Sequence, residues 1–489
     1  MNQNIRNIAP TKVWNHFADL NAVPRPSKKE ERIIQFMVDF GKNLQLDTFV
    51  DKVGNVIIKK PATSDMENRK TIVMQGHLDM VHQKNADTVF DFDNEGIKMY
   101  VDGDWVKAEG TTLGADNGLG VAAIMAVLSS TDISHPTIEA LFTIDEETGM
   151  TGAMGLEGGI LQGEILLNLD TEEDDEIGIG CAGGVDVTAT RRYHEEETPE
   201  NTTAFSITVK GLNGGHSGMD IIKGLGNANK IMNRVLFDGF EKYGLRVSEI
   251  NGGSLRNAIP RESFATIVVD TVSKENFLSE ISMVINKIKE EFSTLESNLA
   301  IDIQEVKSTK AVMELGVQES FIKAIYAAHN GVYRMSPDVN GLVETSNNIA
   351  RIIVKDGAIK VGCLTRSSSE TNKWDLANSL RACFELAGFD VDFSGNYPGW
   401  LPNMNSSILK TVENTYIKLF DAQPNVAACH AGLECGILGQ NYPEMEMISF
   451  GPNIKGAHSP DERAQISSTQ KFWRLLLEVL KNIPEKDEK

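Results

Sequence analysis

The sequence predicts an α/β domain with a mostly parallel central sheet, interrupted by a large inserted α+β domain. Up to about residue 183, short apolar runs alternate with helical stretches, which is typical of strands joined by covering helices. The order of elements changes near Gly183, and the earlier pattern returns after Gly399. We therefore expect a first segment at 1–183, an insertion at 184–398 and a second segment at 399–489.

The sequence of the first segment predicts an initial helix, followed by strands that alternate with helical stretches. Apolar residues between 33 and 40 recur at near-helical spacing, and this predicts a helix. The apolar run from Leu119 to Leu128 predicts a buried helix, and it is far shorter than the ~20 residues that span a bilayer. Short apolar runs predict strands at 55–58, 71–74, 140–144 and 165–169.

The insertion predicts two similar halves, at about 184–298 and 299–398. For the first half we expect strands at 185–190, 205–209 and 264–269, with helices at about 219–236 and 274–292. For the second half we expect strands at 299–306, 349–354 and 359–364, with helices at about 317–330 and 375–387. The repeated order indicates an internal duplication. After the insertion we expect a helix at 406–420, a strand at 445–450 and a helix at 469–480.

Composition excludes several classes of protein. The 489 residues include 47 Lys and Arg against 69 Asp and Glu, for a net charge of −22. This acidity argues against binding to nucleic acid and to an anionic membrane. The start of the chain does not have the pattern of a signal peptide, and five cysteines without CxxC spacing fit a reducing compartment. We therefore expect a cytoplasmic protein.

Histidines and carboxylates follow the predicted strands of the α/β part. His77 ends an apolar strand, Asp116 opens the buried helix, and Asp170 ends another strand. The carboxyl ends of parallel strands meet at one edge of a sheet, where ligands bind. We therefore expect one cluster at this edge, formed by His77, Asp79, Asp116, Glu146, Glu147, Asp170 and His458.

Such a cluster predicts a divalent metal site. Crowded carboxylates repel one another, and their burial is costly unless a cation is present. Histidine and carboxylate ligands without cysteine suit catalytic zinc, with cobalt or manganese as alternatives. Each motif alone has a simpler interpretation: the acids at 145–147 could start a solvated helix, and His458 could be a structural loop residue. It is the ordered set that favours the metal.

The ordered set resembles the co-catalytic zinc peptidases, a family that includes aminoacylases, glutamate-releasing carboxypeptidases, succinyl-diaminopimelate desuccinylase and carnosinases. The matching motifs are Gly76-His-Leu-Asp79, Gly114-Ala-Asp-Asn-Gly118, Asp145-Glu-Glu-Thr-Gly149, Asn168-Leu-Asp170 and Gly456-Ala-His-Ser459. Within the family, the length, the insertion and the segments Gly215-His-Ser217 and Arg256-Asn-Ala-Ile-Pro260 look most like the aminoacyl-histidine dipeptidases.

The resemblance implies two metal ions, most simply zinc, and a role for each residue of the cluster. His77 and Asp170 would hold one ion, Glu147 and His458 the other, and Asp116 would bridge them. Glu146 would be the general base that activates a water. Asp79 would fix the imidazole of His77.

The resemblance also implies that the insertion is a lid that binds substrate. His216 would reach the oxyanion, commonly from a partner subunit, while Asn257 and Arg366 would bind the substrate backbone and terminal carboxylate. Arg366 could instead be a solvated arginine. Glu434 could meet the free ammonium of the substrate or be a structural carboxylate in a turn. A duplicated lid could complete the site within one chain, so that a homodimer would not be needed for catalysis.

We therefore expect metal-dependent hydrolysis of dipeptides, preferably Xaa-His including β-alanyl-histidine. One alternative keeps the family but changes the substrate, to a broad range of dipeptides or to N-acyl amino acids. An alternative of another class is a metal-bearing protein that binds peptides without turnover.

Overall fold

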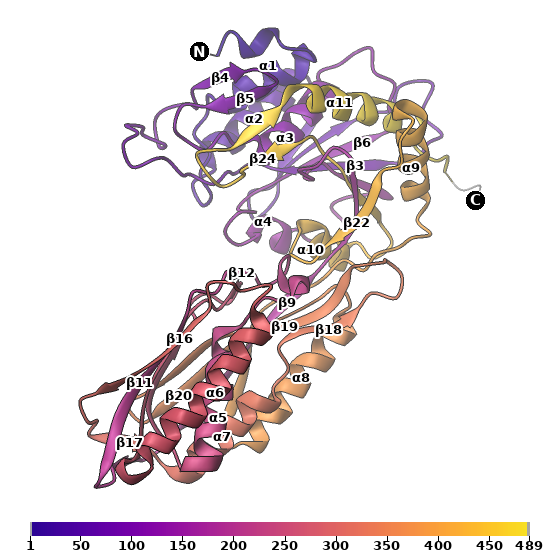
Figure 1. Ribbon diagram of the computed structural model, residues 1–489. Helices are drawn as coiled ribbons and strands as arrows, with labels where there is room; N and C mark the ends of the chain where they lie inside the picture. Colours follow the sequence, from indigo (N-terminus) through magenta and orange to yellow (C-terminus); the bar gives the residue numbers. More distant parts are fainter. Residues whose placement is uncertain (1, 487–489) are drawn as a thin grey trace. The chain divides into compact units, whose positions relative to one another are not determined.

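The computed structural model describes residues 2–486, and these form two compact units (Figure 1). Of the described residues, unit 1 comprises 2–180, 400–428 and 433–486, and unit 2 comprises 181–399 and 429–432. The sequence predicted an insertion at 184–398, without the short segment 429–432.

Unit 1 is built on a sheet of eight strands. Its four central strands, β6, β3, β7 and β23, are parallel, whereas β1 and β2 at one edge are antiparallel. This confirms the predicted α/β class. In spatial order the strands are β1 (Asp47–Val50), β2 (Val56–Lys60), β6 (Ile138–Thr143), β3 (Ile72–His77), β7 (Ile165–Asn168), β23 (Glu446–Ser449), β8 (Glu176–Cys181) and β22 (Asn425–Cys429).

Helices of unit 1 pack on this sheet, and one of them is buried along its length. In α3 every residue except Asp116 is buried, as expected from its apolar sequence. The helix packs against α1 and β3. The helices are α1 (Thr11–Leu20), α2 (Glu31–Asn43), α3 (Ala115–Leu128), α4 (Thr151–Gly155), α9 (Ser407–Phe420), α10 (Glu434–Asn441) and α11 (Ile466–Lys481).

A second, small sheet of unit 1 joins distant parts of the chain. Its four strands are β24 (Ile454–Lys455), β25 (Arg463–Gln465), β5 (Trp105–Ala108) and β4 (Met99–Asp102). Strand β25 pairs with β5, so the loop between β24 and β25 is anchored beside the first segment of the chain.

Unit 2 is a nine-stranded antiparallel sheet with helices on one face (Figure 1). Its helices are α5 (Ala228–Tyr243), α6 (Lys274–Phe292), α7 (Leu315–Ala327) and α8 (Glu370–Leu386). Their apolar sides share one core with the sheet. In spatial order the strands are β16 (Ala300–Val306), β11 (Thr202–Lys210), β15 (Ser263–Asp270), β13 (Arg246–Gly252), β19 (Val343–Lys355), β20 (Ala358–Ser367), β9 (Gly183–Arg192) and β21 (Asp390–Tyr397), with β18 (Gly331–Met335) beside β19.

The sheet of unit 2 contains two four-stranded sets with the same topology, and β18 is its ninth strand. One set runs β11-α5-β13-β15-α6-β16 and the other β9-α7-β19-β20-α8-β21, and in each the fourth strand lies beside the first and the third beside the second. Strands β13 and β19, the second of each set, join the two. A duplication of sequence stays a prediction. Apart from Gly183, strand β9 lies within the half predicted at 184–298, but it pairs with β20 and β21 of the second set.

The helix predicted at 219–236 is interrupted. A short 3-10 turn ends at Lys223, and α5 begins only at Ala228. Gly224 between them has φ 67°, a left-handed conformation that stops a helix. Asn227 then caps α5, because its side chain accepts hydrogen bonds from two backbone N–H groups of the first turn.

Candidate metal centre

The predicted metal ligands converge at one edge of the sheet in unit 1. His77 is the last residue of β3, and Asp170 lies two residues beyond β7. Asp116 lies in the first turn of α3, and Glu147 follows β6 in a turn. His458 comes from the loop between β24 and β25, far along the chain.

Asp116 lies between two groups of ligand atoms. One carboxylate oxygen lies 3.2 Å from His77 Nε2, which is 3.6 Å from Asp170 Oδ1. The other oxygen lies 3.1 Å from His458 Nε2, which is 2.9 Å from Glu147 Oε2. Each group offers three ligand atoms within 4.8 Å of one another. The arrangement therefore has the form of two adjacent cation sites that share one carboxylate.

The donor set fits divalent cations. Glu147 Oε1 is buried without a hydrogen-bond donor from residues 2–486, and such an oxygen is costly unless something positive meets it. Burial raises the pKa of Asp170 well above its usual range, although His77 opposes this shift. Imidazole and carboxylate ligands suit zinc, cobalt or manganese.

Asp79 holds the residues around the cluster. One oxygen lies 3.4 Å from His77 Nδ1, and the carboxylate accepts the backbone N–H groups of Glu146 and Glu147 at 3.1 and 3.2 Å. Burial alone would raise the pKa of Asp79, but its contacts with His77 and with the hydroxyl of Ser27 lower it to about 2. Asp79 therefore fixes both a predicted ligand and the turn that carries two glutamates.

Glu146 and Glu147 point to different partners although they are adjacent. Asp145 before them has φ 54°, so the chain turns sharply after β6. Glu147 contacts His458, whereas Glu146 Oε2 lies 4.0 Å from His77 Nε2. Burial, opposed by His77 and aided by nearby carboxylates, raises the pKa of Glu146 to about 8. Glu146 also forms a third group of potential ligands with His77 and Glu147, so the geometry allows it to act as base or as ligand.

Glu434 is a buried carboxylate of the same unit, at the start of α10. Its Oε2 accepts hydrogen bonds from Gln75 Nε2 at 2.6 Å and Thr143 Oγ1 at 2.7 Å. Its Oε1 is buried and has no hydrogen-bond donor within residues 2–486. Burial raises the pKa of Glu434 to about 7. Glu434 is therefore a buried carboxylate held by two donors, with one oxygen that no donor from residues 2–486 meets.

A second buried acidic group, formed by Glu30, Asp79 and Asp145, is explained by its hydrogen bonds. Glu30 accepts backbone N–H groups of Lys28 and Asp145. Asp145 accepts the hydroxyl groups of Thr148 and Thr151. These donors stabilise the turns that contain Glu30 and Asp145, so this acidic group does not require a cation.

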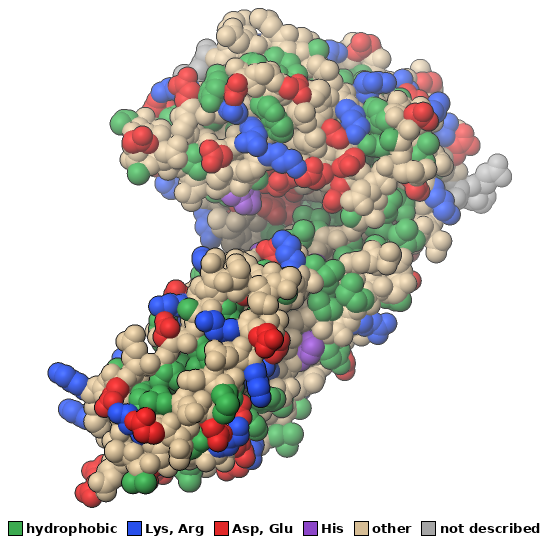
Figure 2. Space-filling model, viewed as in Figure 1, with side chains coloured by type: hydrophobic (Ala, Val, Ile, Leu, Met, Phe, Trp, Pro, Cys, Tyr) green, Lys and Arg blue, Asp and Glu red, His purple; other side chains and the backbone are tan. Residues whose placement is uncertain are grey.

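Acidic side chains gather beside a histidine on one face of unit 1 (Figure 2). By contrast, the remaining predicted residues, His216, Asn257 and Arg366, belong to unit 2. There they lie on or beside three strands, β12 (Gly215–His216), β14 (Ala258–Ile259) and β20.

His216 has a defined protonation state at its two ring nitrogens. Backbone N–H groups of Gly218 and Met219 donate to Nδ1 at 3.2 and 3.1 Å, so Nδ1 is an acceptor and the neutral ring carries its proton on Nε2. Burial and the charge of Arg366 lower the pKa of His216, which favours this neutral ring. His216 therefore presents an N–H donor.

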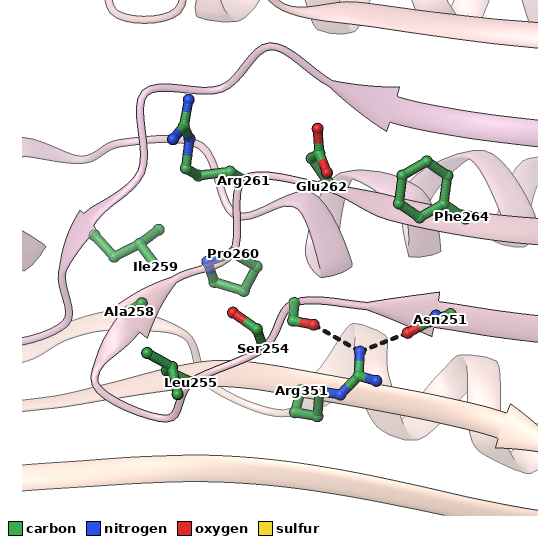
Figure 3. A pocket seen from close by; sticks show the side chains of 11 residues that line it. Asn251, Ser254, Leu255, Ala258, Ile259, Pro260, Arg261, Glu262, Phe264 and Arg351 are labelled. Atoms are coloured by element: carbon green, nitrogen blue, oxygen red, sulfur yellow. Dashed lines mark hydrogen bonds between the residues drawn. The ribbon is translucent and has the colours of Figure 1, made fainter. Parts of the chain in front are cut away.

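The loop that carries Asn257 is held on both sides. Asn348 Nδ2 donates to the carbonyl groups of Arg256 and Ala258, the neighbours of Asn257. Arg351 Nη1 donates to Asn251 and to the carbonyl of Gly253 (Figure 3). The residues drawn in Figure 3 line a cavity of about 780 Å³ beside this loop.

Arg366 is buried, with 4% of its surface exposed, so the interpretation as a solvated arginine is wrong. Its Nη1 donates to Tyr397 Oη at 2.7 Å, and its Nε lies 3.5 Å from Ser217 Oγ. The backbone N–H of Ser217 donates to the carbonyl of Asn257 at 2.8 Å. Hydrogen bonds thus connect the segments that carry His216, Asn257 and Arg366.

Residues 73–482 match peptidase family M20/M25/M40. The chain belongs to this family. It is 45% identical over 479 residues to a cytosol non-specific dipeptidase of Escherichia coli K12, covering 98% of this chain and 99% of that protein. The crystal structure of an aminoacylhistidine dipeptidase from Vibrio alginolyticus is 44% identical, with a TM-score of 0.94 and coverage of 99% and 98%. The aminopeptidase PepT from Bacillus cereus shares the fold alone, at 15% identity and a TM-score of 0.57 over 97% of this chain and 99% of that one.

Membership of the M20/M25/M40 family confirms the resemblance found in the sequence. Within residues 2–486, no helix is both long enough and apolar enough to cross a membrane.

Three buried polar residues near the candidate sites were not predicted from the sequence. His430 lies in unit 2, with Nε2 2.8 Å from Ser346 Oγ. A Cβ at Gly218 would lie 2.0 Å from the carbonyl oxygen of His430, so the small residue at 218 allows the His216 turn to approach. Arg25 and Glu462 surround the Asp116 segment in unit 1. The proximity of Glu462 to His458 in sequence was the available signal, whereas Arg25 had none.

Proposed function

We propose that this member of the M20/M25/M40 family is a cytoplasmic dipeptidase that uses two zinc ions and prefers Xaa-His substrates, including β-alanyl-histidine. The observation that carries the proposal is the shared carboxylate of Asp116, with an imidazole and a second carboxylate on each side. The dipeptidase names of two relatives at 44 and 45% identity support it.

The proposed ligands are His77 and Asp170 for one ion, Glu147 and His458 for the other, and Asp116 for both. When bound, the two cations would polarise the scissile carbonyl and make the attacking water more acidic. Three ligand carboxylates in a buried cluster would offset most of the added charge.

Glu146 is the proposed general base. Its carboxylate would take a proton from the attacking water and then deliver it to the nitrogen of the leaving amine. The backbone N–H bond to Asp79 supports this role, because it fixes the turn from which the Glu146 side chain projects. Asp79 would thus act on the reaction through His77 and Glu146.

Glu434 is the proposed partner of the free ammonium group of the dipeptide. Its Oε1 is buried and meets no hydrogen-bond donor of the described part of the chain. Such an oxygen is costly as long as it lacks a donor, and an ammonium group would supply both charge and hydrogen bonds. An N-acyl group offers only a neutral amide. This observation favours a dipeptidase over an N-acyl amino acid deacylase.

His216, Asn257 and Arg366 are the proposed substrate-binding residues of unit 2. A neutral His216 with its proton on Nε2 suits donation to a substrate oxygen, and the buried guanidinium of Arg366 suits a terminal carboxylate. We propose that one chain suffices for catalysis, because unit 2 contains two four-stranded sets. A homodimer is compatible with this proposal.

The test of the mechanism compares two variants. Glu146→Ala should keep both metal ions and lose turnover by about 10²- to 10⁴-fold. His458→Ala should instead lose one ion, measured as metal per chain after dialysis. Near-normal turnover in Glu146→Ala would refute the assigned base.

The test of specificity is a panel of Ala-His, Ala-Leu, Gly-Gly-His and N-acetyl-histidine. A broad dipeptidase is the second candidate function, because the relative from E. coli is called non-specific, and it predicts similar rates for Ala-His and Ala-Leu. Preference for the tripeptide or the acylated substrate would refute the dipeptidase. Absence of hydrolysis with bound metal would indicate a peptide-binding protein without turnover.

A further inference from the structure

The loop between β24 and β25 carries the exposed His458 and also a buried carboxylate, that of Glu462. Glu462 is four residues further along and only 2% exposed. Its two carboxylate oxygens accept four consecutive backbone N–H groups, those of Leu113 at 2.7 Å, Gly114 at 2.9 Å, Ala115 at 2.8 Å and Asp116 at 3.3 Å. One side chain therefore fixes the whole approach to Asp116.

Arg25 binds the same backbone segment by donating a hydrogen bond to one of its carbonyl groups. It is 1% exposed, and its Nη2 donates to the carbonyl of Gly114 at 2.6 Å. Its Nη1 donates to the carbonyl groups of Leu78 and Asp79 at 3.0 Å each. The peptide units around Gly114 are thus held between an anion and a cation, and a Cβ at this position would lie 2.5 Å from Arg25 Nη2.

Two separate links therefore join the loop of His458 to the segment of Asp116. The first is the side-chain contact of 3.1 Å between His458 Nε2 and Asp116 Oδ2. The second is the set of hydrogen bonds from the Leu113–Asp116 backbone to Glu462. Because the two segments are remote in sequence, the second link keeps the two side chains together when their own contact is broken.

We propose that Glu462 is a positioning residue of the metal centre, which fixes Asp116 relative to His458. This inference rests on the proposed metal ligands. With the Glu462 bonds intact, both side chains are prealigned for the cation that they share with Glu147. Without these bonds, Asp116 and His458 must be ordered when the cation binds, and this lowers the metal affinity. Residues that orient metal ligands typically contribute 10- to 100-fold in affinity.

A matched control in unit 2 distinguishes the positioning of metal ligands from a purely structural role. Glu296 is also 2% exposed, and it accepts the backbone N–H groups of Asn213 at 2.7 Å and Gly226 at 2.8 Å. Both glutamates hold backbone loops through buried hydrogen bonds. Only Glu462 holds a segment that carries a proposed metal ligand.

The experiment measures zinc affinity by competition with a chelator in the full-length wild type, Glu462→Gln, Glu462→Asp and Glu296→Gln. The amide of Gln can accept on one oxygen only, so we expect one of the two zinc affinities to fall about 10- to 100-fold in Glu462→Gln. Asp keeps the charge but is shorter, so Glu462→Asp should show a smaller loss; it also serves if the Gln variant does not fold. Glu296→Gln should keep both affinities.

Two further measurements distinguish positioning from loss of stability. In protein loaded with Co²⁺, the visible absorption of one site should change in Glu462→Gln and not in Glu296→Gln. At limiting zinc kcat should fall with KM unchanged, and excess zinc should restore kcat. Wild-type affinities in both Glu462 variants, or an equal loss in Glu296→Gln, would overturn the inference. If the wild type binds zinc but hydrolyses no dipeptide, the proposed function fails while the affinity comparison still decides the role of Glu462.

Discussion

The two units bury polar clusters of opposite character. In unit 1, carboxylates crowd together, and burial raises the pKa of Glu146 to about 8 and of Glu434 to about 7. In unit 2, two histidines lie near the buried Arg366. Burial and the charge of this arginine lower the pKa of His216 and lower that of His430 to about 3.

The difference indicates what each cluster is suited to bind. The carboxylates of unit 1 are short of positive charge, and their free oxygens suit metal ions and an ammonium group. The histidines of unit 2 stay neutral at pH 7, so they act there as hydrogen-bond partners while Arg366 supplies positive charge for an anion. Each cluster thus suits a ligand group of the opposite charge.

The largest expected effect is the loss of the shared carboxylate in unit 1. Asp116→Asn removes the charge that both proposed sites use, so both ions should be lost and activity should fall to background. Metal per chain, measured after dialysis, checks the prediction. Asp170→Asn is the control, because it should affect one ion only. Retention of two ions in Asp116→Asn would contradict the shared role.

The next effect concerns the positive charge of unit 2. Arg366→Ala should lower kcat/KM for dipeptides roughly 100-fold, because a charge that pairs in a buried site is removed. The metal content should be unchanged. Arg246→Ala is the matched control, since Arg246 of the same sheet pairs with Glu196 and donates to the carbonyl of Met313, none of which is a proposed substrate-binding residue. An equal loss in both variants would show that Arg366 is only structural.

A smaller effect is expected at the ammonium site. Glu434→Gln should raise KM for free dipeptides roughly tenfold, the size of a hydrogen bond to a charged group, and should leave the rate with N-acetyl-histidine unchanged. Glu139→Gln is the control, because Glu139 is also buried in unit 1 and accepts backbone N–H groups. An unchanged KM in Glu434→Gln would exclude the ammonium role.

The smallest effect is a pH dependence of stability from His430. Its pKa is about 3 in the folded protein against 6.5 for the free side chain, so the unfolded chain binds more protons between these values. This contribution to stability is complete above pH 6.5 and declines as the pH falls towards 3. Lowering the pH from 7 to 5 should therefore reduce the melting temperature less in His430→Gln than in the wild type, by about 2 °C. Equal reductions would contradict the shift.

The sequence predicted which potential metal ligands lie together in unit 1 better than it predicted the residues around them. His77 and Asp170 follow from their positions at strand ends, because parallel strands bring such ends together, and Asp116 follows from its position at the start of the buried helix. Arg25 could not be predicted, and Glu462 was indicated only by its proximity to His458, since the contacts of both residues depend on backbone groups that approach only after folding. The interruption at Gly224 was missed because a left-handed glycine between two apolar stretches leaves the helical periodicity almost unchanged.

In unit 2 the first strand set lies, along the chain, between strands of the second set. This order has a consequence for folding during translation. Of the strands in this sheet, β9 leaves the ribosome first, but its hydrogen-bonding neighbours are β20 and β21, at 358–367 and 390–397. The set from β11 to β16 lies entirely between them in the chain and can form while β9 waits unpaired. We expect this inner set to be protected from proteolysis early in translation and the outer set only when residue 397 has emerged.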